Sequence, residues 1–503
     1  MTVEKKDIDW GSLGFGYMKT DYSYEAHWKD GEWDEGGLTT DHTLHVSECG
    51  GIFHYCQEVF EGLKAYTAED GSIVCFRPDM NAERMYNSAQ RLEMPPFPKD
   101  KFVEAVKQVV SANAAWVPPF GSGATLYVRP FMIGSGDVIG VAPAPEYTFR
   151  ILVTPVGPYF KGGLKPVKLR VSEYDRAAPH GTGNIKAGLN YAMSLKPTME
   201  AHREGYAENL YLDSESRTYV EETGGANVLF VKEDGTLVVP QSHTDSILPS
   251  ITRRSLVQVA QDLGMTVDQR PVEWAEVKAG TFVECGLCGT AAVISPVGEI
   301  DNKVYGADET VTFPAGYTEI GPVMKKLRET LTGIQSGAVE DKHNWVYWLF
   351  SGTVASNLRF GNEGATEGDM LHALEVAQST FVLDQPQGLD TPVAQGGTNF
   401  SGGQRQRLAI ARALMKRADL YIFDDSFSAL DFKTDAALRH ALQDETRDAA
   451  VLIIAQRIST ILHADQIVVL KDGEVVGLGT HGELMETCEV YRAIAESQMK
   501  GGE

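Results

Sequence analysis

The stretch GTGNIKAGLNY, residues 181–191, sets a single lysine, Lys186, among glycines and follows it five residues later with Tyr191. The ordinary explanation of such a lysine is a solvated loop side chain. A second stretch, ETGGAN at 222–227, starts with Glu222 and leads into an apolar strand. An amine, a phenol and a carboxylate in this setting are suited to covalent and acid–base chemistry.

Further segments accompany these stretches: VFEGLKAY (59–66), FRPDMNAERMYNSAQRL (76–92), LYVRPFMIG (126–134), LPSITRRS (248–255) and CGTAAVISPVG (288–298). In this order they resemble the fold-type IV pyridoxal-phosphate transaminases, specifically the branched-chain amino acid aminotransferases, over about residues 10–348. The resemblance implies an α+β fold of two α/β lobes. The small lobe would span 1–155 and the large cofactor-binding lobe 165–348, joined by an interdomain loop at 156–164.

Local patterns agree with such a mixed fold. Helices are expected over 80–92, 101–114 and 250–263, the last with apolar residues at helical spacing and Gly264 after it. Strands are expected over 124–133, 148–156, 209–213, 228–232, 420–423 and 451–455.

The resemblance implies pyridoxal 5′-phosphate as cofactor and assigns each reactive group a role. Lys186 supplies the primary amine that bonds to the cofactor aldehyde, and once displaced by substrate it can carry a proton at the substrate α-carbon. Glu222 is placed beside the pyridine nitrogen, where a carboxylate favours the protonated ring. Tyr191 is placed at the ring oxygen of the cofactor.

The cofactor phosphate needs donors rather than a reactive group. The resemblance assigns it to Arg84, whose guanidinium can bind two oxygens. The start of the 250–263 helix offers the N–H groups of Ile251 and Thr252 and a favourable dipole. Thr290 can add a hydroxyl and backbone donors.

A transaminase of this family accepts an aliphatic side chain and that of glutamate in one pocket. The expected aromatic walls are Tyr55, Phe60 and Tyr159, each of which core packing would explain equally well. Tyr127 and Arg129 form the Tyr-x-Arg that would accept the distal carboxylate of glutamate or 2-oxoglutarate. The turn at Thr290 and Ala291 is also assigned to the substrate. Leucine, isoleucine and valine all stay open as the branched-chain partner.

The last part of the chain, from about residue 349 to 503, has a different character. FSGGQ (400–404) resembles the signature sequence of ABC exporter nucleotide-binding domains, and LYIFDDSFSALD (420–431) resembles their Walker B strand and D-loop. Motif residues in this segment are Ser401, Gly402, Gly403, Gln404, Asp424, Asp425 and Gln456. The segment is interpreted as a truncated α/β cassette fragment.

Several departures predict that this fragment has no ATPase activity. The sequence contains no Gly-Lys dipeptide and therefore no Walker A loop. Asp425 stands where the catalytic glutamate is usual, and Gln456 replaces the switch histidine. The fragment could at most act as a weak partner of a complete cassette.

Composition limits the partners. The 503 residues carry 69 acidic against 45 basic side chains, a formal net charge of −24. Nucleic acid is not expected as a partner because a phosphate backbone needs a basic face. The polar N-terminus lacks the apolar core of a signal peptide, and no run reaches the roughly 18 apolar residues that cross a bilayer. We therefore expect a cytoplasmic protein without a membrane span and, from the family, a homodimer.

Cysteine usage argues against a disulfide scaffold or a metal site. Cys285 and Cys288 form one CxxC pair without the second pair that a four-ligand zinc site requires. No metal is expected. The pair is open to two interpretations, buried structural thiols or redox-sensitive thiols.

Two rival functions also remain open. Another fold-type IV enzyme, such as a D-amino acid transaminase or an aminodeoxychorismate lyase, would use the same cofactor residues, although Tyr127-x-Arg129 and EGLKAY favour the branched-chain enzyme. An ATP-dependent, transporter-associated regulatory subunit would depend on the C-terminal fragment, and the missing Walker A loop argues against it.

Overall fold

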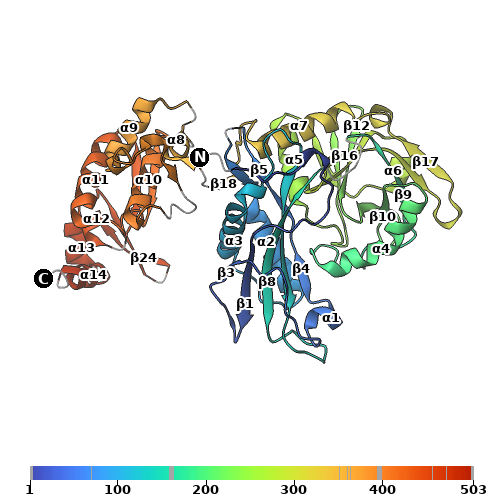
Figure 1. The fold of residues 1–503 in the computed structure, drawn as a ribbon, viewed down its shortest axis with the longest axis horizontal. Helices are drawn as coiled ribbons and strands as arrows, with labels where there is room; N and C mark the ends of the chain where they lie inside the picture. Colours follow the sequence, from blue (N-terminus) through green and yellow to red (C-terminus); the bar gives the residue numbers. More distant parts are fainter. Residues whose placement is uncertain are drawn as a thin grey trace. The chain divides into compact units, whose positions relative to one another are not determined.

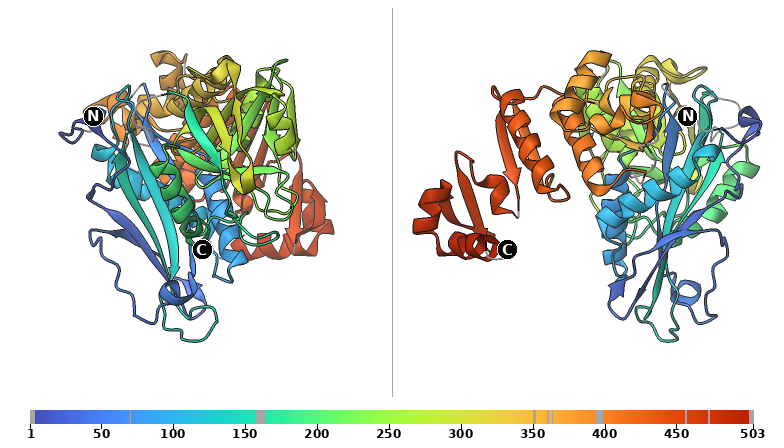
Figure 2. Two further views of the ribbon diagram at one scale, coloured as in Figure 1. Left: turned by 90° about the vertical axis from the view of Figure 1, so that its right-hand side faces the viewer. Right: turned by 60° about the vertical axis from the view of Figure 1, so that its left-hand side comes forward.

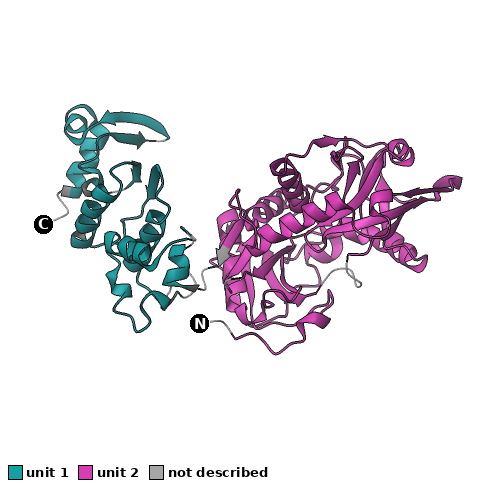
Figure 3. Ribbon diagram, turned by 90° about the horizontal axis from the view of Figure 1, so that it is seen from above, with its two compact units in different colours: residues 1, 350–503 teal, residues 2–349 magenta. Residues whose placement is uncertain are grey.

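The computed structural model describes residues 4–69, 71–157, 164–349, 352–359, 361–362, 364–393, 399–455, 457–471 and 473–499. The chain divides into two compact units, Thr2–Leu349 and Phe350–Glu503, which Figure 3 draws in magenta and teal. Among the described residues no helix combines the length and the apolar character that crossing a membrane would need.

The first sheet of the unit 2–349 is built from β1 (Ser23–Lys29), β2 (Glu32–Trp33), β3 (Gly37–Thr39), β4 (Glu58–Phe60), β5 (Leu63–Thr67), β6 (Ile73–Phe76), β7 (Thr125–Gly134), β8 (Tyr147–Val156) and β18 (Val346–Leu349). Its order is β18-β6-β5-β7-β8-β1-β2, with β3 added on β1 and β4 on β7. The long strands β7 and β8 pair antiparallel and lie side by side in Figure 2. Leu349, where the sequence patterns start the appended fragment, thus ends a strand of this sheet.

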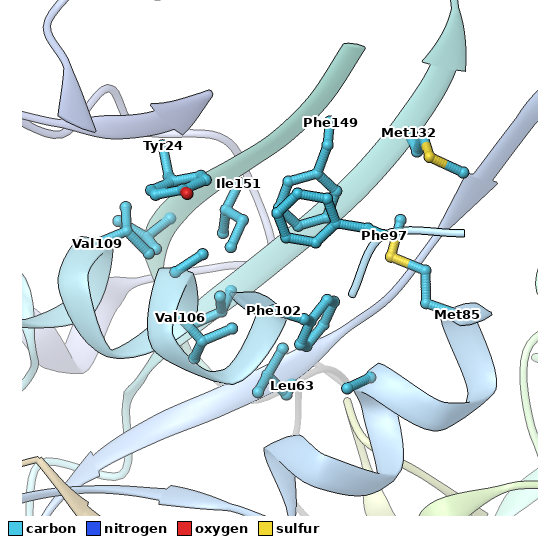
Figure 4. Close-up of a cluster of buried hydrophobic side chains, with 14 of the residues drawn as sticks. Tyr24, Leu63, Met85, Phe97, Phe102, Val106, Val109, Met132, Phe149 and Ile151 are labelled. Carbon is cyan, nitrogen blue, oxygen red and sulfur yellow. The ribbon is translucent and has the colours of Figure 1, made fainter. Parts of the chain in front are cut away.

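Helices α2 (Pro78–Arg91) and α3 (Lys99–Ala112) cover this sheet. Pro78 begins α2, where its fixed φ suits the first helical position. Figure 4 shows the core between the helices and β8, in which the Phe97 and Phe149 rings stack with centroids 3.9 Å apart. This well-packed core therefore supports strands β4 and β5 on the side of the sheet that the two helices cover.

The second sheet contains β9 (Val167–Val171), β10 (Glu208–Leu212), β11 (Val220–Thr223), β12 (Asn227–Lys232), β13 (Leu237–Pro240), β14 (Val267–Arg270), β15 (Phe282–Gly289), β16 (Val293–Asn302) and β17 (Glu309–Thr312). Its order is β11-β10-β9-β16-β15-β12-β13-β14, and β11 also pairs with β12. That extra pairing, Glu222 opposite Asn227, closes the strands from β11 to β12 into a ring.

Helices of the second lobe are α4 (Gly188–Arg203), α5 (Ile251–Asp262), α6 (Trp274–Lys278) and α7 (Pro322–Ser336), and the short α1 (Gly51–Tyr55) belongs to the first lobe. Helix α5 begins after Ser250, whose side chain accepts the Arg253 N–H. This cap satisfies one of the free donors at the helix start.

The unit 350–503 contains α8 (Val354–Arg359), α9 (Glu367–Val376), α10 (Gly402–Leu414), α11 (Phe432–Glu445), α12 (Ile458–Ile461), α13 (His481–Thr487) and α14 (Glu489–Met499). Its strands pair as β19 (Gly352–Thr353) with β20 (Pro392–Val393), β21 (Leu420–Asp424) with β22 (Ala450–Ile454), and β23 (Ile467–Lys471) with β24 (Glu474–Gly479). Leu420 and Ile422 on β21 are 52% and 59% exposed, so this pair of strands leaves apolar side chains uncovered.

The elements expected from local patterns are confirmed. The three expected helices correspond to α2, α3 and α5, and the six expected strands to β7, β8, β10, β12, β21 and β22, with ends that differ by at most two residues. The expected interdomain loop lies largely at 158–163, outside the described residues.

Candidate active site

Lys186 lies in the turn that leads into α4, and Tyr191 lies in the first turns of that helix. The Lys186 Nζ and the Tyr191 hydroxyl are 2.7 Å apart. The same amine lies 4.6 Å from the centroid of the Phe60 ring. A side chain at Gly188 would meet the carboxylate of Glu58, so a substitution there would displace that carboxylate. The structure therefore brings Lys186, Tyr191 and Phe60 together.

Glu222 is buried on β11 and held on both carboxylate oxygens. Oε1 lies 2.8 Å from the Arg176 guanidinium and accepts the Leu248 N–H at 2.8 Å. Oε2 accepts the Asn227 amide at 2.5 Å. Burial raises the pKa of Glu222, while Arg176 and the Leu248 N–H oppose that rise. The carboxylate is thus fixed in direction by three partners.

Arg84 is buried on α2 and faces the start of α5. Its Nε and Nη2 each donate to Glu61 at 2.7 Å, which occupies one edge of the guanidinium. Its Nη1 donates to the Pro249 carbonyl at 3.2 Å, just before α5. In the described chain the N–H groups of Ile251 and Thr252 find no acceptor, as expected at a helix start. The remaining guanidinium edge and these donors suit a phosphate.

More positive charge surrounds this cup. Burial first, and then the like charges of Arg84 and Arg77, lower the pKa of Arg254 on α5. Arg77 Nη1 donates to the Ser255 hydroxyl on the same helix at 2.8 Å. A doubly charged anion would relieve this repulsion.

Thr290 and Ala291 form the turn between β15 and β16. The turn is tied to the first sheet by Lys64 on β5, whose Nζ donates to the Ala291 carbonyl at 2.8 Å. Burial lowers the pKa of Lys64 to about 8. A buried lysine thus fixes the predicted substrate turn.

Tyr127 and Arg129 project from β7 beside this cluster. Arg129 Nη2 donates to the Tyr127 hydroxyl at 3.0 Å, and its guanidinium lies 4.8 Å from the Phe60 ring and 5.2 Å from the Tyr127 ring. Among the described residues no carboxylate lies within ion-pair distance of Arg129, and its Nε is buried without a partner. A charge in this state is available to a ligand.

Residues 58–300 match the family described as Amino-transferase class IV. A branched-chain-amino-acid aminotransferase of Haemophilus influenzae is 50% identical over 349 residues, covering 68% of this chain and 98% of that protein. The crystal structure of the Escherichia coli branched-chain amino acid aminotransferase has a TM-score of 0.56 at 28% identity, covering 66% of this chain and 100% of that chain. The chain belongs to the branched-chain-amino-acid aminotransferases.

This aminotransferase is therefore a pyridoxal-phosphate-dependent enzyme, and the expected α+β, fold-type IV architecture is confirmed. A T.th. branched-chain amino acid aminotransferase, solved with pyridoxamine 5′-phosphate, matches with a TM-score of 0.56 at 27% identity, covering 66% of this chain and 100% of that chain. A second match, to the family described as ABC transporter, covers residues 327–428 and supports the fusion. That match begins within α7 of the first unit.

The donor set of the aminotransferase unit fits pyridoxal 5′-phosphate. An amine and a phenol lie in contact at Lys186 and Tyr191, a buried carboxylate stands at Glu222, and unoccupied donors remain at Arg84 and the start of α5. No group of three metal-ligating side chains occurs within the described ranges.

The other predicted wall residues are not joined to this cluster. Tyr55 is half-buried at the end of α1, and its hydroxyl donates to the Ile139 carbonyl. No interaction described for Tyr55 reaches Lys186 or Arg129. Tyr159 lies outside the described residues.

Four further residues at the site were not predicted from the sequence. Glu61, Lys64 and Arg176 contact predicted site residues, and Glu58 accepts the N–H of Gly188, two residues after Lys186. A signal existed for Glu61 and Lys64. They stand inside the apolar run VFEGLKAY, and charged side chains are rarely buried unless they are paired.

Cys285 and Cys288 both lie buried on β15. Cys285 packs in one hydrophobic cluster and Cys288 in another, because residues three apart on a strand face opposite sides. Burial raises the pKa of Cys288 to about 12 and raises that of Cys285 as well. These properties favour structural thiols over redox-sensitive ones.

In the C-terminal unit, Ser401 caps α10 and accepts the Gln404 N–H, while Gln404 bonds back to the Ser401 N–H. Gly402 and Gly403 form the first turn of that helix. Asp424 ends β21, and Asp425 follows with φ of 47°. Gln456 lies outside the described residues.

Proposed function

We propose that the unit 2–349 transfers an amino group between leucine, isoleucine or valine and 2-oxoglutarate. The observation that carries this proposal is the Phe60 ring, which contacts both the Lys186 amine at 4.6 Å and the Arg129 guanidinium at 4.8 Å. The reactive amine of Lys186, the apolar Phe60 ring and the Arg129 guanidinium, which has no carboxylate partner in the described chain, thus lie at one site. An aliphatic side chain needs the wall, and a distal carboxylate needs the cation.

Each side chain of the site has its own role in the proposed reaction. Bound pyridoxal 5′-phosphate supplies the aldehyde that takes up the amino group and a ring that withdraws electrons from the α-carbon. Lys186 moves the proton at that carbon, and Tyr191 orients its amine through the 2.7 Å contact. The Glu222 carboxylate, fixed by its three partners, holds the proton at the ring nitrogen. Arg84, Ile251, Thr252 and Thr290 hold the phosphate, and Thr290 with Ala291 orients the substrate carboxylate.

A comparison of amino donors tests this function. Purified full-length protein with added cofactor is expected to form glutamate from leucine and 2-oxoglutarate, and to be much slower with D-alanine as donor. Preference for D-alanine would indicate the D-amino acid transaminase instead. Release of a lyase product without an amino acceptor would indicate the aminodeoxychorismate lyase class. The absence of turnover with all of these donors would refute the proposal.

We propose further that the enzyme is a cytoplasmic homodimer. Leu195 and Met199, one helical turn apart on α4, are 66% and 49% exposed, and this apolar surface suits a subunit contact. A half-buried Tyr55 fits a substrate wall that a second subunit completes, and Tyr159 is retained as a wall residue. Light scattering of the purified protein distinguishes a dimer from a monomer.

The segment 349–503 is proposed to be a truncated nucleotide-binding fragment without ATPase activity. The missing Walker A loop supports this proposal, because phosphoryl transfer depends on clamping the phosphates and magnesium. The Ser401 hydroxyl already accepts the Gln404 backbone N–H, and the Gln404 side-chain oxygen accepts the Ser401 backbone N–H. At most the fragment would complete a site on another, intact cassette.

A further inference from the structure

Glu58 is a carboxylate beside Lys186 to which the proposed reaction gives no role. It precedes Phe60 by two residues on β4, so both side chains project from the same face of the strand. β4 runs along the segment that carries Lys186: the Phe60 N–H donates to the Lys186 carbonyl at 3.0 Å, and Glu58 Oε2 accepts the Gly188 N–H at 2.7 Å. The carboxylate is therefore fixed at the start of α4, two residues along the chain from Lys186.

Lys186 and Arg129 act electrostatically on this carboxylate. Both cations lie on the Phe60 ring, the neighbouring side chain on the same strand face. Burial raises the pKa of Glu58, while the Gly188 N–H, Arg129 and Lys186 oppose that rise. Arg129 has no carboxylate within ion-pair distance in the described chain, so the longer-range attraction between Arg129 and Glu58 partly compensates the charge of the guanidinium.

This compensation affects the substrates in opposite ways. When an aliphatic side chain fills the pocket, Arg129 is desolvated without a ligand counter-ion, and a nearby carboxylate lowers that cost. When a dicarboxylic substrate binds, its distal carboxylate neutralises Arg129 itself and then experiences Glu58 as a like charge. A carboxylate at this position therefore favours the aliphatic partner and disfavours the dicarboxylic one.

We propose that Glu58 is a positioning residue that sets the balance between branched-chain and dicarboxylic substrates by compensating the charge of Arg129. The inference rests on the proposed function, in which both substrate classes share this pocket. It assigns to Glu58 a part in specificity and none in the proton transfer.

The variant Glu58→Gln tests this role because it removes the charge and keeps an oxygen that can accept the Gly188 N–H. We expect KM to fall for 2-oxoglutarate and to rise for 4-methyl-2-oxopentanoate, with kcat changing less. The ratio of the two kcat/KM values should move toward the dicarboxylic substrate roughly three- to thirtyfold, the size of one unit charge acting across a few ångströms at a partly buried site. The dissociation constants of glutarate and 4-methylvaleric acid, which cannot react, should change in the same directions when titrated into the holoenzyme.

Glu284→Gln is the matched control. Glu284 is a buried glutamate whose pKa burial raises, as it does for the half-buried Glu58, and it accepts the N–H groups of Val323 and Met324 at the start of α7, at 3.1 and 2.9 Å. It should leave the substrate ratio unchanged. Glu58→Ala should repeat the shift of Glu58→Gln, and Glu58→Asp, which keeps the charge, should retain the wild-type preference.

An unchanged ratio in both Glu58→Gln and Glu58→Ala, or a shift toward the aliphatic substrate, would overturn the inference. Failure of the wild-type enzyme to use either 2-oxo acid would refute the proposed function instead. The two failures are thus distinguishable.

Discussion

Arg129→Met separates the two kinds of substrate most directly. The substitution keeps an unbranched apolar side chain on β7 and removes the guanidinium. The wild-type side chain makes one hydrogen bond, to Tyr127 at 3.0 Å, and cation–π contacts at 4.8 and 5.2 Å. Those cation–π contacts are worth about 0.5–1 kcal/mol each and are lost whichever substrate is present.

The difference between substrates comes from the ligand carboxylate alone. A charge-assisted hydrogen bond contributes about 1.5–3 kcal/mol, which corresponds to a loss of roughly ten- to a hundredfold. We therefore expect the half-reaction with glutamate to slow by that factor relative to the half-reaction with leucine. Single-turnover absorbance changes of the bound cofactor measure both rates in the same preparation.

Arg150→Met provides the control for this experiment. Arg150 is a buried arginine on β8 that pairs with Glu25 at 2.6 Å and donates to the Thr43 carbonyl at 2.9 Å. Its loss should lower stability and leave the rate ratio unchanged. Equal losses for leucine and glutamate in Arg129→Met would show that Arg129 only supports the sheet, and the dicarboxylate argument would fail.

Other expectations follow from single contacts. Lys186→Ala should abolish turnover while the thermal unfolding midpoint of the apoenzyme changes little; measurable transamination by this variant would contradict the assignment. Burial lowers the pKa of Lys64 to about 8, so the folded chain binds fewer protons than the unfolded one between pH 8 and about 10.4. Wild-type stability should therefore gain roughly 3 kcal/mol across that window from this group, and denaturant titrations of Lys64→Met should lack the gain. Ending the chain after Leu349 should leave the transaminase rate nearly unchanged, and the full-length protein should show no ATPase activity above background; ATP turnover that Asp424→Ala removes would refute the inactive-fragment proposal.

Local patterns were sufficient where an element is determined by its own residues. Helix α5 has its cap at Ser250 and its apolar face at helical spacing, so its start was predicted to within one residue. The long strand β7 was equally recognisable from its apolar run. The roles assigned to Lys186, Tyr191 and Glu222 depended on family resemblance, because no local pattern states that a loop lysine will meet a tyrosine at 2.7 Å.

The remaining contacts depend on how distant segments dock. Lys64 meets Ala291 across 227 residues of sequence, and Arg84 meets Pro249 across 165. Such pairs form only when the first lobe packs against the second. Hydrophobic periodicity predicts single helices and strands and says nothing about this packing. Glu61 and Lys64 nevertheless leave a signal in the sequence. They interrupt an apolar run, and a charged side chain buried there requires a partner.

Strand β18 has a consequence for the order of events during synthesis. It pairs with β6, so the edge of the sheet formed near the N-terminus is completed only by residues 346–349, at the far end of the enzyme unit. A chain ending at Leu349 would still hold this strand inside the ribosome when translation stops, and β6 would lack its neighbour until the chain is released. While residues 350–503 are translated, β18 leaves the ribosome, so it can pair with β6 before synthesis of the chain ends.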